Sequence, residues 1–364
     1  MRIALTHPYC WPYVQRGGER LFADLTRYLA SRGHDVVTVS AGPERGSRLE
    51  DGVLAVRHRA LNSPRLARHD IDQPVTYLPQ AAWSLRRHKP DVVHGMFHLD
   101  GVAARLAGRR PYVVHVQGMP SRQVAERRRV HARLLPYSMG RAAAVIAVSR
   151  AAANQLAADF GLEARPVLNG VFTDDFRRAP GADRSDTPTI LFPGDPDDPR
   201  KRIDVLATAV EQLLPSWPGL RLSIAAPPSP DVAARLHARL GPALELLDVA
   251  SPSEMPAAYA RAWVTCLPAV REAFGLVFIE SLAAGTPAVG IRDGGVPEVL
   301  GEPAWLAAPD DPADLAAALH RALTAQRESR LEDMCVELAR PFDWSARGPA
   351  FEALYEEVTA AAGR

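Results

Sequence analysis

The sequence predicts an α/β protein with two doubly wound domains, each a parallel sheet covered by helices on both faces. Short runs rich in β-branched residues alternate with longer stretches whose apolar residues recur at helical spacing. This alternation pauses over 173–188, which is polar and rich in Pro, Gly and Asp, and then resumes. The chain of 364 residues is also too long for one ordinary core. We therefore expect two domains facing each other across a cleft, with ligands at the carboxyl ends of the strands.

The expected elements fall into two sets on either side of the polar segment. The first set has a helix at 18–33 and strands at 2–6, 34–40, 91–95, 111–118 and 143–149. The second set has strands at 189–194, 220–226, 243–249, 262–268 and 286–291. The expected domains are 1–178 and 186–342. Residues 343–364 have helical spacing and predict a terminal helix, which either crosses back to the first domain or packs on the second.

Composition limits the class of protein and its partners. A charged content of 23% and a formal net charge of +1 are typical of a soluble globular protein and argue against a nucleic-acid partner. The odd number of widely spaced cysteines, Cys10, Cys266 and Cys335, predicts neither a disulfide framework nor a zinc site. The first apolar run has three residues, and no stretch approaches a membrane span. We expect a cytoplasmic protein.

The stretch "REAFGLVFIESLAAG" places Glu272 and Glu280 eight residues apart. In one continuous helix the two carboxylates would point about 80° apart, so they would not share a face. If the helix instead begins near Phe274 and Gly275, Glu272 lies in the preceding loop. The first backbone N–H groups of such a helix, around Leu276, are free to bind an anion.

These groups together suit a particular ligand. Gly275 allows close approach to the backbone, and the helix start favours phosphate. The carboxylates can accept hydrogen bonds from ribose or sugar hydroxyls. The stretch therefore predicts a site for a nucleotide-sugar, although a core helix with two surface glutamates is compatible with the same spacing.

The segments "EAFGLVFIE", "SLAAGTPAVGIRDGGVPEV", "LNGVFTDDF", "VIAVS", "DVVHG" and "RGGER" occur in order along nearly the whole chain. With them, the chain resembles the retaining GT-B glycosyltransferases of family 4 and their Glu-x7-Glu signature. The resemblance implies two Rossmann-like domains with a nucleotide-sugar in the cleft. It also implies that Glu280 holds the ribose, that Glu272 positions the donor sugar, and that the amides of Phe274, Gly275 and Leu276 hold phosphate.

The segment "GDPDDPRKRID" carries the next part of the resemblance. Lys201 matches the family lysine on the diphosphate, which makes it the second expected catalytic residue beside Glu272. Asp195 stands where the family has an arginine, so Arg200 or Arg202 is expected to supply the missing charge. A solvated basic helix start is the alternative.

The acidic residues of the same segment allow a metal-site interpretation, because Asp-x-Asp pairs bind Mg²⁺ in another glycosyltransferase fold. We expect instead that they form caps and turns. The family implies no metal and no cofactor, since the nucleotide-sugar is a co-substrate.

Other candidate residues lie in loops of both domains. Gly17 and Gly18 open a helix and are expected to face the phosphates. Gln117 replaces the histidine of related enzymes, and we expect it to bind the donor sugar or acceptor without proton transfer. His94 and His98 either line the acceptor side or are structural. Leu247, Asp248 and Val249 are expected near the nucleobase, for which we favour UDP over GDP.

The expected function is that of a metal-independent, retaining glycosyltransferase acting on an acceptor hydroxyl or amine. Natural products, lipid-linked sugars and polysaccharides all remain open as acceptors. The alternatives are a non-catalytic nucleotide-sugar-binding paralogue and a sugar phosphorylase or synthase of the same fold. The basic stretch 121–140 predicts either peripheral contact with an anionic membrane or a solvated helix face.

Overall fold

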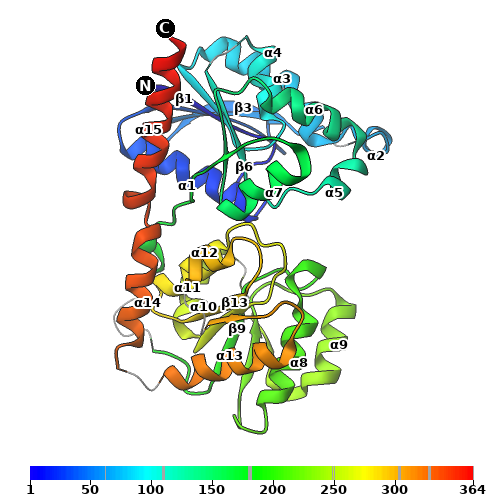
Figure 1. Cartoon of the computed structure of the whole chain (residues 1–364), viewed down its shortest axis with the longest axis vertical. Coiled ribbons are helices and arrows are strands. Elements are labelled where there is room, and N and C mark those ends of the chain that lie inside the picture. The colour runs from blue at the N-terminus through cyan, green and yellow to red at the C-terminus, as the bar shows by residue number, and fades with distance from the viewer. Residues whose placement is uncertain are drawn as a thin grey trace. The chain divides into compact units, whose positions relative to one another are not determined.

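The computed structural model of the chain describes residues 1–61, 63–108, 111–178, 183–247, 249, 251–301, 305–326 and 329–363. It divides into two compact units (Figure 1). Unit 1 comprises Met1–Gly170 and Trp344–Arg364, and unit 2 comprises Val171–Asp343. Within the described residues, no helix combines the length and apolar character needed to cross a bilayer.

Unit 1 is built on an eight-stranded sheet of order β3-β4-β2-β1-β5-β6-β7-β8. The strands are β1 (Arg2–His7), β2 (Asp35–Gly42), β3 (Gly46–Glu50), β4 (Val53–Arg59), β5 (Val92–Gly95), β6 (Tyr112–Val116), β7 (Ala144–Ala147) and β8 (Arg165–Pro166). Ile3 of β1 lies opposite Val36 of β2 and Val92 of β5, and all three side chains are buried. The central strands are apolar on both faces because helices cover both.

The helices of unit 1 are α1 (Gly17–Ser31), α2 (Pro64–Ala67), α3 (Gln73–His88), α4 (Asp100–Leu106), α5 (Arg122–Glu126), α6 (Arg129–Met139), α7 (Arg150–Phe160) and α15 (Trp344–Ala362). In α1 the apolar residues at helical spacing, among them Leu21, Leu25 and Leu29, form its buried face. Ser149 caps α7 by accepting a hydrogen bond from the Ala152 amide.

Strand β3 is the exception to the parallel sheet predicted for this half, because it forms an antiparallel hairpin with β4, while β4 pairs parallel with β2. The turn of the hairpin uses Asp51 and Gly52, both with positive φ (48° and 79°). Asp-Gly is a preferred pair for such two-residue hairpin turns. Asp51-Gly52 is thus the feature of the sequence that points to this hairpin.

Unit 2 has a six-stranded, all-parallel sheet of order β11-β10-β9-β12-β13-β14. Its strands are β9 (Thr189–Phe192), β10 (Arg221–Ile224), β11 (Leu244–Leu246), β12 (Val264–Leu267), β13 (Ala288–Ile291) and β14 (Leu306–Ala307). Its α-helices are α8 (Ile203–Leu213), α9 (Pro230–Leu240), α10 (Met255–Arg261), α11 (Leu276–Ala283), α12 (Val296–Leu300), α13 (Pro312–Ala325) and α14 (Leu331–Ala339). Short 3₁₀ helices are η1 (Thr173–Phe176), η2 (Pro199–Lys201), η3 (Gly241–Ala243), η4 (Pro252–Glu254) and η6 (Arg340–Phe342).

Part of the segment predicted as a linker, 173–188, belongs to unit 2. Phe176 of η1 is buried, and its ring lies 6.0 Å from that of Tyr259. Asp343 accepts hydrogen bonds from the Thr173 amide (3.1 Å) and hydroxyl (2.7 Å). The polar composition of the segment does not predict this packing, because a single buried aromatic ring is enough to hold an otherwise polar short helix in place. Residues 179–182 of the predicted linker lie outside the described residues.

Helix α15 belongs to unit 1, which is one of the two placements that its spacing left open. Phe351 and Tyr355 have no exposed surface. A Cβ atom on Gly348 would lie 1.9 Å from the Tyr28 ring, so only glycine allows α15 to approach α1 this closely. The Tyr28 hydroxyl donates a hydrogen bond of 2.6 Å to Glu352.

Candidate active site

The loop that carries Glu272 follows β12 in unit 2, and backbone hydrogen bonds hold it in place. The Val270 amide donates to the Arg200 carbonyl (2.9 Å), and the Gly295 amide donates to the Glu272 carbonyl (2.8 Å). A Cβ on Gly294, which has φ +59°, would lie 2.2 Å from that same carbonyl oxygen. The loop is therefore fixed between the turn before α8 and the glycine turn before α12.

The two predicted catalytic residues meet in this loop. Lys201 Nζ lies 2.7 Å from Glu272 Oε2, and each side chain is 20% exposed. Lys201 ends η2, whose start is capped by Asp198 accepting from the Arg200 amide (2.9 Å). The site thus presents an ammonium and a carboxylate side by side, both accessible to solvent.

Helix α11 begins at Leu276, which confirms the predicted split of the Glu-x7-Glu stretch. Gly275 is the residue before the helix and has φ +92°; a Cβ there would lie 2.5 Å from the Phe278 ring. The first N–H groups of a helix have no carbonyl one turn earlier, so they are donors for an anion. The Phe274 side chain is buried and its ring lies 6.0 Å from that of Phe342, so it supports the loop from inside.

Glu280 lies in the second turn of α11 and is 9% exposed. Its Oε2 atom accepts a hydrogen bond of 2.8 Å from the hydroxyl of Tyr259, which lies in α10 and has no exposed surface. Tyr259 is not among the site residues predicted from the sequence. A buried tyrosine requires a partner for its hydroxyl, but the sequence alone does not say which one.

The arginines expected to compensate for Asp195 are both paired with acids. Arg200 lies 2.6 Å from Asp198, and this hydrogen bond raises the pKa of its guanidinium. Arg202, which has φ +54°, lies 2.9 Å from Asp310. Asp195 itself accepts a hydrogen bond from the Asp197 amide (2.9 Å) and so closes a turn. Lys201 is thus the cation nearest to Glu272 in this cluster.

In unit 1, Gly18 at the start of α1 lies against Gln117, the residue after β6. A Cβ on Gly18 would lie 2.7 Å from Gln117 Oε1 and 3.8 Å from His7 Nε2. Among the described residues, neither amide atom of Gln117 has a hydrogen-bond partner, although both are buried. Burial lowers the pKa of His7 to about 4, so this imidazole is neutral. The structure therefore adds His7, at the end of β1, to the predicted group of Gly17, Gly18 and Gln117.

His94, which was expected either on the acceptor side or as a structural residue, is structural. It lies within β5, has no exposed surface, and its Nδ1 atom is 2.7 Å from the Tyr355 hydroxyl. Its ring stacks on His115, with centroids 5.3 Å apart. His94 is therefore a core residue, because the strand extends beyond it. His98 is half-buried beside Phe97, and burial lowers its pKa.

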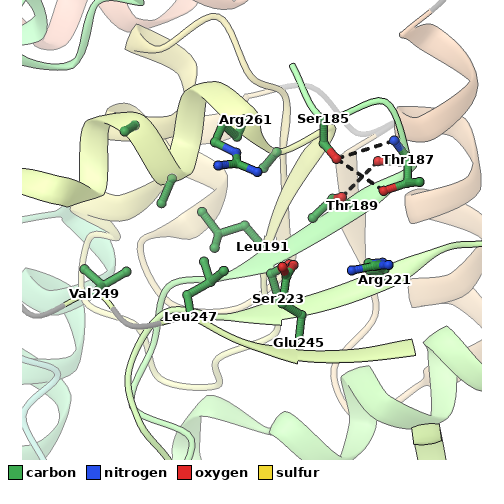
Figure 2. Close-up of a pocket in the computed structure, with 13 residues that line it drawn as sticks. Ser185, Thr187, Thr189, Leu191, Arg221, Ser223, Glu245, Leu247, Val249 and Arg261 are labelled. Atoms are coloured by element: carbon green, nitrogen blue, oxygen red, sulfur yellow. Dashed lines mark hydrogen bonds between the residues drawn. The ribbon is translucent and has the colours of Figure 1, made fainter. Parts of the chain in front are cut away.

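Two of the three residues expected near the nucleobase, Leu247 and Val249, line a cavity of about 320 Å³ on the unit 2 sheet (Figure 2). Asp248 lies outside the described residues. The residues that line this cavity do not include Lys201, Glu272 or Gly275. The cavity and the Lys201–Glu272 pair are therefore distinct features of unit 2.

Comparison with known proteins gives two family matches that divide the chain. Residues 15–175 match Glycosyltransferase Family 4, and residues 187–325 match Glycosyl transferases group 1. The D-inositol 3-phosphate glycosyltransferase of Acidothermus cellulolyticus is 30% identical over 401 residues, which cover 96% of this chain and 88% of that protein. The corresponding Corynebacterium efficiens enzyme is 36% identical over 175 residues, which cover 45% of this chain and only 41% of its own length.

Solved structures show the same fold at low identity. Sucrose-phosphate synthase from Thermosynechococcus elongatus superposes with a TM-score of 0.80 at 21% identity, covering 99% of both chains. Anabaena HepE in complex with UDP-glucose superposes with a TM-score of 0.75 at 17% identity, covering 98% of this chain and 100% of that one. The chain therefore belongs to the group 1 glycosyltransferases of glycosyltransferase family 4 and has their GT-B fold.

Proposed function

We propose that the chain transfers a sugar from a nucleoside-diphosphate-sugar to an acceptor hydroxyl or amine, with retention of configuration and without a metal ion. The observation that carries this proposal is the ion pair between Lys201, at the end of η2, and Glu272, in the loop that leads into α11, with 2.7 Å between Nζ and Oε2. A cation, a carboxylate and a helix start gathered at one place match the phosphate and the sugar of such a donor.

In this proposal the diphosphate binds the first amides of α11 and Lys201. Glu280 accepts hydrogen bonds from the ribose hydroxyls, and Glu272 accepts them from the donor sugar. The bond between the anomeric carbon and the diphosphate oxygen breaks as the acceptor oxygen bonds to that carbon. The acceptor proton passes to the leaving diphosphate. Fixed positive charge at the leaving oxygen lowers the barrier by an amount that mutagenesis elsewhere puts at about 3–4 kcal/mol for one donor.

Unit 1 offers groups of a different kind. The unpartnered amide of Gln117 can donate and accept hydrogen bonds with a sugar hydroxyl. Because a side-chain amide acts as neither an acid nor a base near neutral pH, we assign it a binding role.

The names of similar proteins suggest which substrates to test first. HepE has been solved in complex with UDP and with UDP-glucose. Relatives are D-inositol 3-phosphate glycosyltransferases and a phosphatidyl-myo-inositol mannosyltransferase of Mycobacterium tuberculosis, which is 32% identical over 231 residues covering 58% of this chain. We therefore propose UDP as the donor nucleotide and the hydroxyl of a phosphorylated cyclitol as the first acceptor to assay.

Glu272→Gln tests the proposal directly. We expect kcat to fall about 10²–10³-fold, because the amide cannot provide the negative charge paired with Lys201. The Kd for UDP should change by less than about threefold, since Glu272 contacts the sugar. Glu337→Gln is the matched control, because Glu337 pairs with Arg340 on an exposed surface.

Three outcomes would contradict the proposal. Full activity of Glu272→Gln would remove that residue from the mechanism. UDP-sugar binding without product for any acceptor would favour a non-catalytic paralogue. Consumption of free phosphate without nucleotide dependence would favour a phosphorylase.

A further inference from the structure

The cavity of about 320 Å³ in unit 2 lies over strands β9, β10 and β11, and helix α10 forms its side wall (Figure 2). The strand residues that line it are Thr189, Leu191, Arg221, Ser223 and Glu245. The intervening residues, such as Ile190, Leu222 and Ile224, are buried on the opposite face. The cavity is therefore a hollow on one face of the sheet.

This hollow is unusual for a parallel sheet, whose faces are normally both covered and apolar. Helix α10 has only seven residues and carries the chain from β11 at the sheet edge to β12. It is too short to cover three strands. The sequence reflects this in β10, "RLSI", which alternates polar and apolar residues, whereas β13, "AVGI", is buried throughout.

One end of the cavity carries positive charge and hydroxyl groups. Arg221 and Arg261 both line it, and within the described part of the chain neither side chain makes an ion pair or hydrogen bond. In Figure 2, Ser185, Thr187 and Thr189 cluster to the right of Arg261 and above Arg221. The Ser185 and Thr187 hydroxyls are 3.2 Å apart. Guanidinium groups beside hydroxyls are suited to phosphate.

The rest of the cavity differs in chemistry. Glu245 accepts a hydrogen bond from the Ser223 hydroxyl, and its carboxylate can accept further ones from a polyol. Leu191, Leu247 and the alanines of α10 supply apolar surface, against which the less polar face of a sugar ring can pack. A volume of about 320 Å³ is at the small end of the range of ligand sites.

We propose that this cavity is a second binding site, which takes a small phosphorylated polyol such as a sugar phosphate. The phosphate lies against Arg221, Arg261 and the neighbouring hydroxyls, and the polyol hydroxyls face Glu245. This site does not include Lys201, Glu272 or Gly275 of the proposed donor site. Leu247 and Val249, which were expected near the nucleobase, line this cavity, so the proposal assigns them to the second site.

The test is calorimetric titration of the full chain at saturating UDP, with glucose 6-phosphate, glucose and inorganic phosphate as probes. Glucose 6-phosphate should bind at least about tenfold more tightly than either fragment, because both ends contribute hydrogen bonds to charged groups. Arg221→Ala and Arg261→Ala should each weaken it at least about tenfold. Arg330→Ala is the matched control, since Arg330 is an exposed arginine of unit 2 outside the cavity.

A second variant separates loss of the ligand from loss of the fold. Ala257→Trp on the exposed wall of α10 should fill the cavity and abolish glucose 6-phosphate binding, while UDP binding is kept. The proposal is overturned if all variants bind equally, if saturating UDP removes binding, or if phosphate alone binds as tightly. Failure of all three probes to bind the wild-type chain also overturns it.

Discussion

Tyr259 connects the carboxylate proposed to hold ribose to a second helix of unit 2. Its hydroxyl donates a 2.8 Å hydrogen bond to Glu280, and its side chain is fully buried. A hydrogen bond to one oxygen of a carboxylate fixes the orientation of the whole group. We therefore infer that Tyr259 positions Glu280 for the ribose.

Tyr259→Phe removes only this hydroxyl. We expect UDP to bind about three- to tenfold more weakly, since one net hydrogen bond contributes about 0.5–1.5 kcal/mol. The loss should not appear for 2′,3′-dideoxyuridine diphosphate, which lacks the hydroxyls that Glu280 would bind. Titration of both nucleotides checks this, with Glu280→Gln as the reference. Equal loss for both nucleotides would mean that Tyr259 has only a structural role.

At the residue scale, sequence motifs pointed to Glu272, Gly275 and Glu280 by their spacing in one short stretch, and to Lys201 by a separate segment 71 residues before Glu272. They did not locate Tyr259 or His7, whose partners are distant in sequence and are set by packing. They left His94 either on the acceptor side or structural, and the structure shows it in β5 with its Nδ1 atom 2.7 Å from the hydroxyl of Tyr355 in the terminal helix. Side-chain environments that depend on distant segments are not encoded in local spacing.

At the element scale, Gly275 determines where α11 begins. Its φ of +92° and its closeness to the Phe278 ring both exclude a side chain. An L-residue in the left-handed region costs about 1–2 kcal/mol before any clash is counted. The amides that follow are the ones proposed to hold phosphate.

Gly275→Ala should therefore weaken UDP binding by at least about tenfold and also lower stability. Gly219→Ala is a matched control, because Gly219 has φ +82° but no heavy atom within 4 Å of the added Cβ. The Gly219→Ala control should lose the same stability of about 1–2 kcal/mol from an L-residue at positive φ, without a clash of the added Cβ with a neighbouring side chain. Thermal unfolding and UDP titration of both variants give the comparison. Equal UDP affinity in the two variants would argue against phosphate at this helix start.

Among the elements, long helices and central strands were predictable because their apolar periodicity is strong. The hairpin β3–β4 and the two-residue strands β8 and β14 were missed, since their signals are short. The parallel sheet predicted for unit 1 has one antiparallel strand, β3 at its edge, because the Asp51–Gly52 turn reverses the chain between β3 and β4.

At the scale of the whole molecule, buried histidines are concentrated in unit 1. Burial lowers the pKa of His7 to about 4 and of His115 to about 3, and lowers that of His94 and His98 as well. Each histidine is neutral in the folded unit but protonates near pH 6.5 when unfolded. The unfolded state therefore binds more protons below about pH 6.5, and stability falls as pH falls toward 4.

One buried acid opposes this trend. Burial raises the pKa of Asp100 to about 7, so the folded state holds its proton where the unfolded state does not. Between pH 4 and 7 this single group makes the chain more stable as pH falls. Four histidines outweigh one carboxyl, so the net effect of acidification on unit 1 is destabilising.

We therefore expect the unfolding free energy of unit 1 to fall by more than about 1.4 kcal/mol per pH unit between pH 6 and 5, which corresponds to more than one net proton. Calorimetric scans across this range measure the unfolding free energy. UDP should raise the unfolding transition of unit 2, because a ligand that binds only the folded state stabilises it.

His115→Leu should reduce the pH slope by about one proton, since His115 is fully buried with no partner for either ring nitrogen among the described residues. His69→Leu, at an exposed position of the same unit, should leave the slope unchanged. A slope in His115→Leu equal to that of the wild-type chain would show that this histidine does not carry the acid sensitivity.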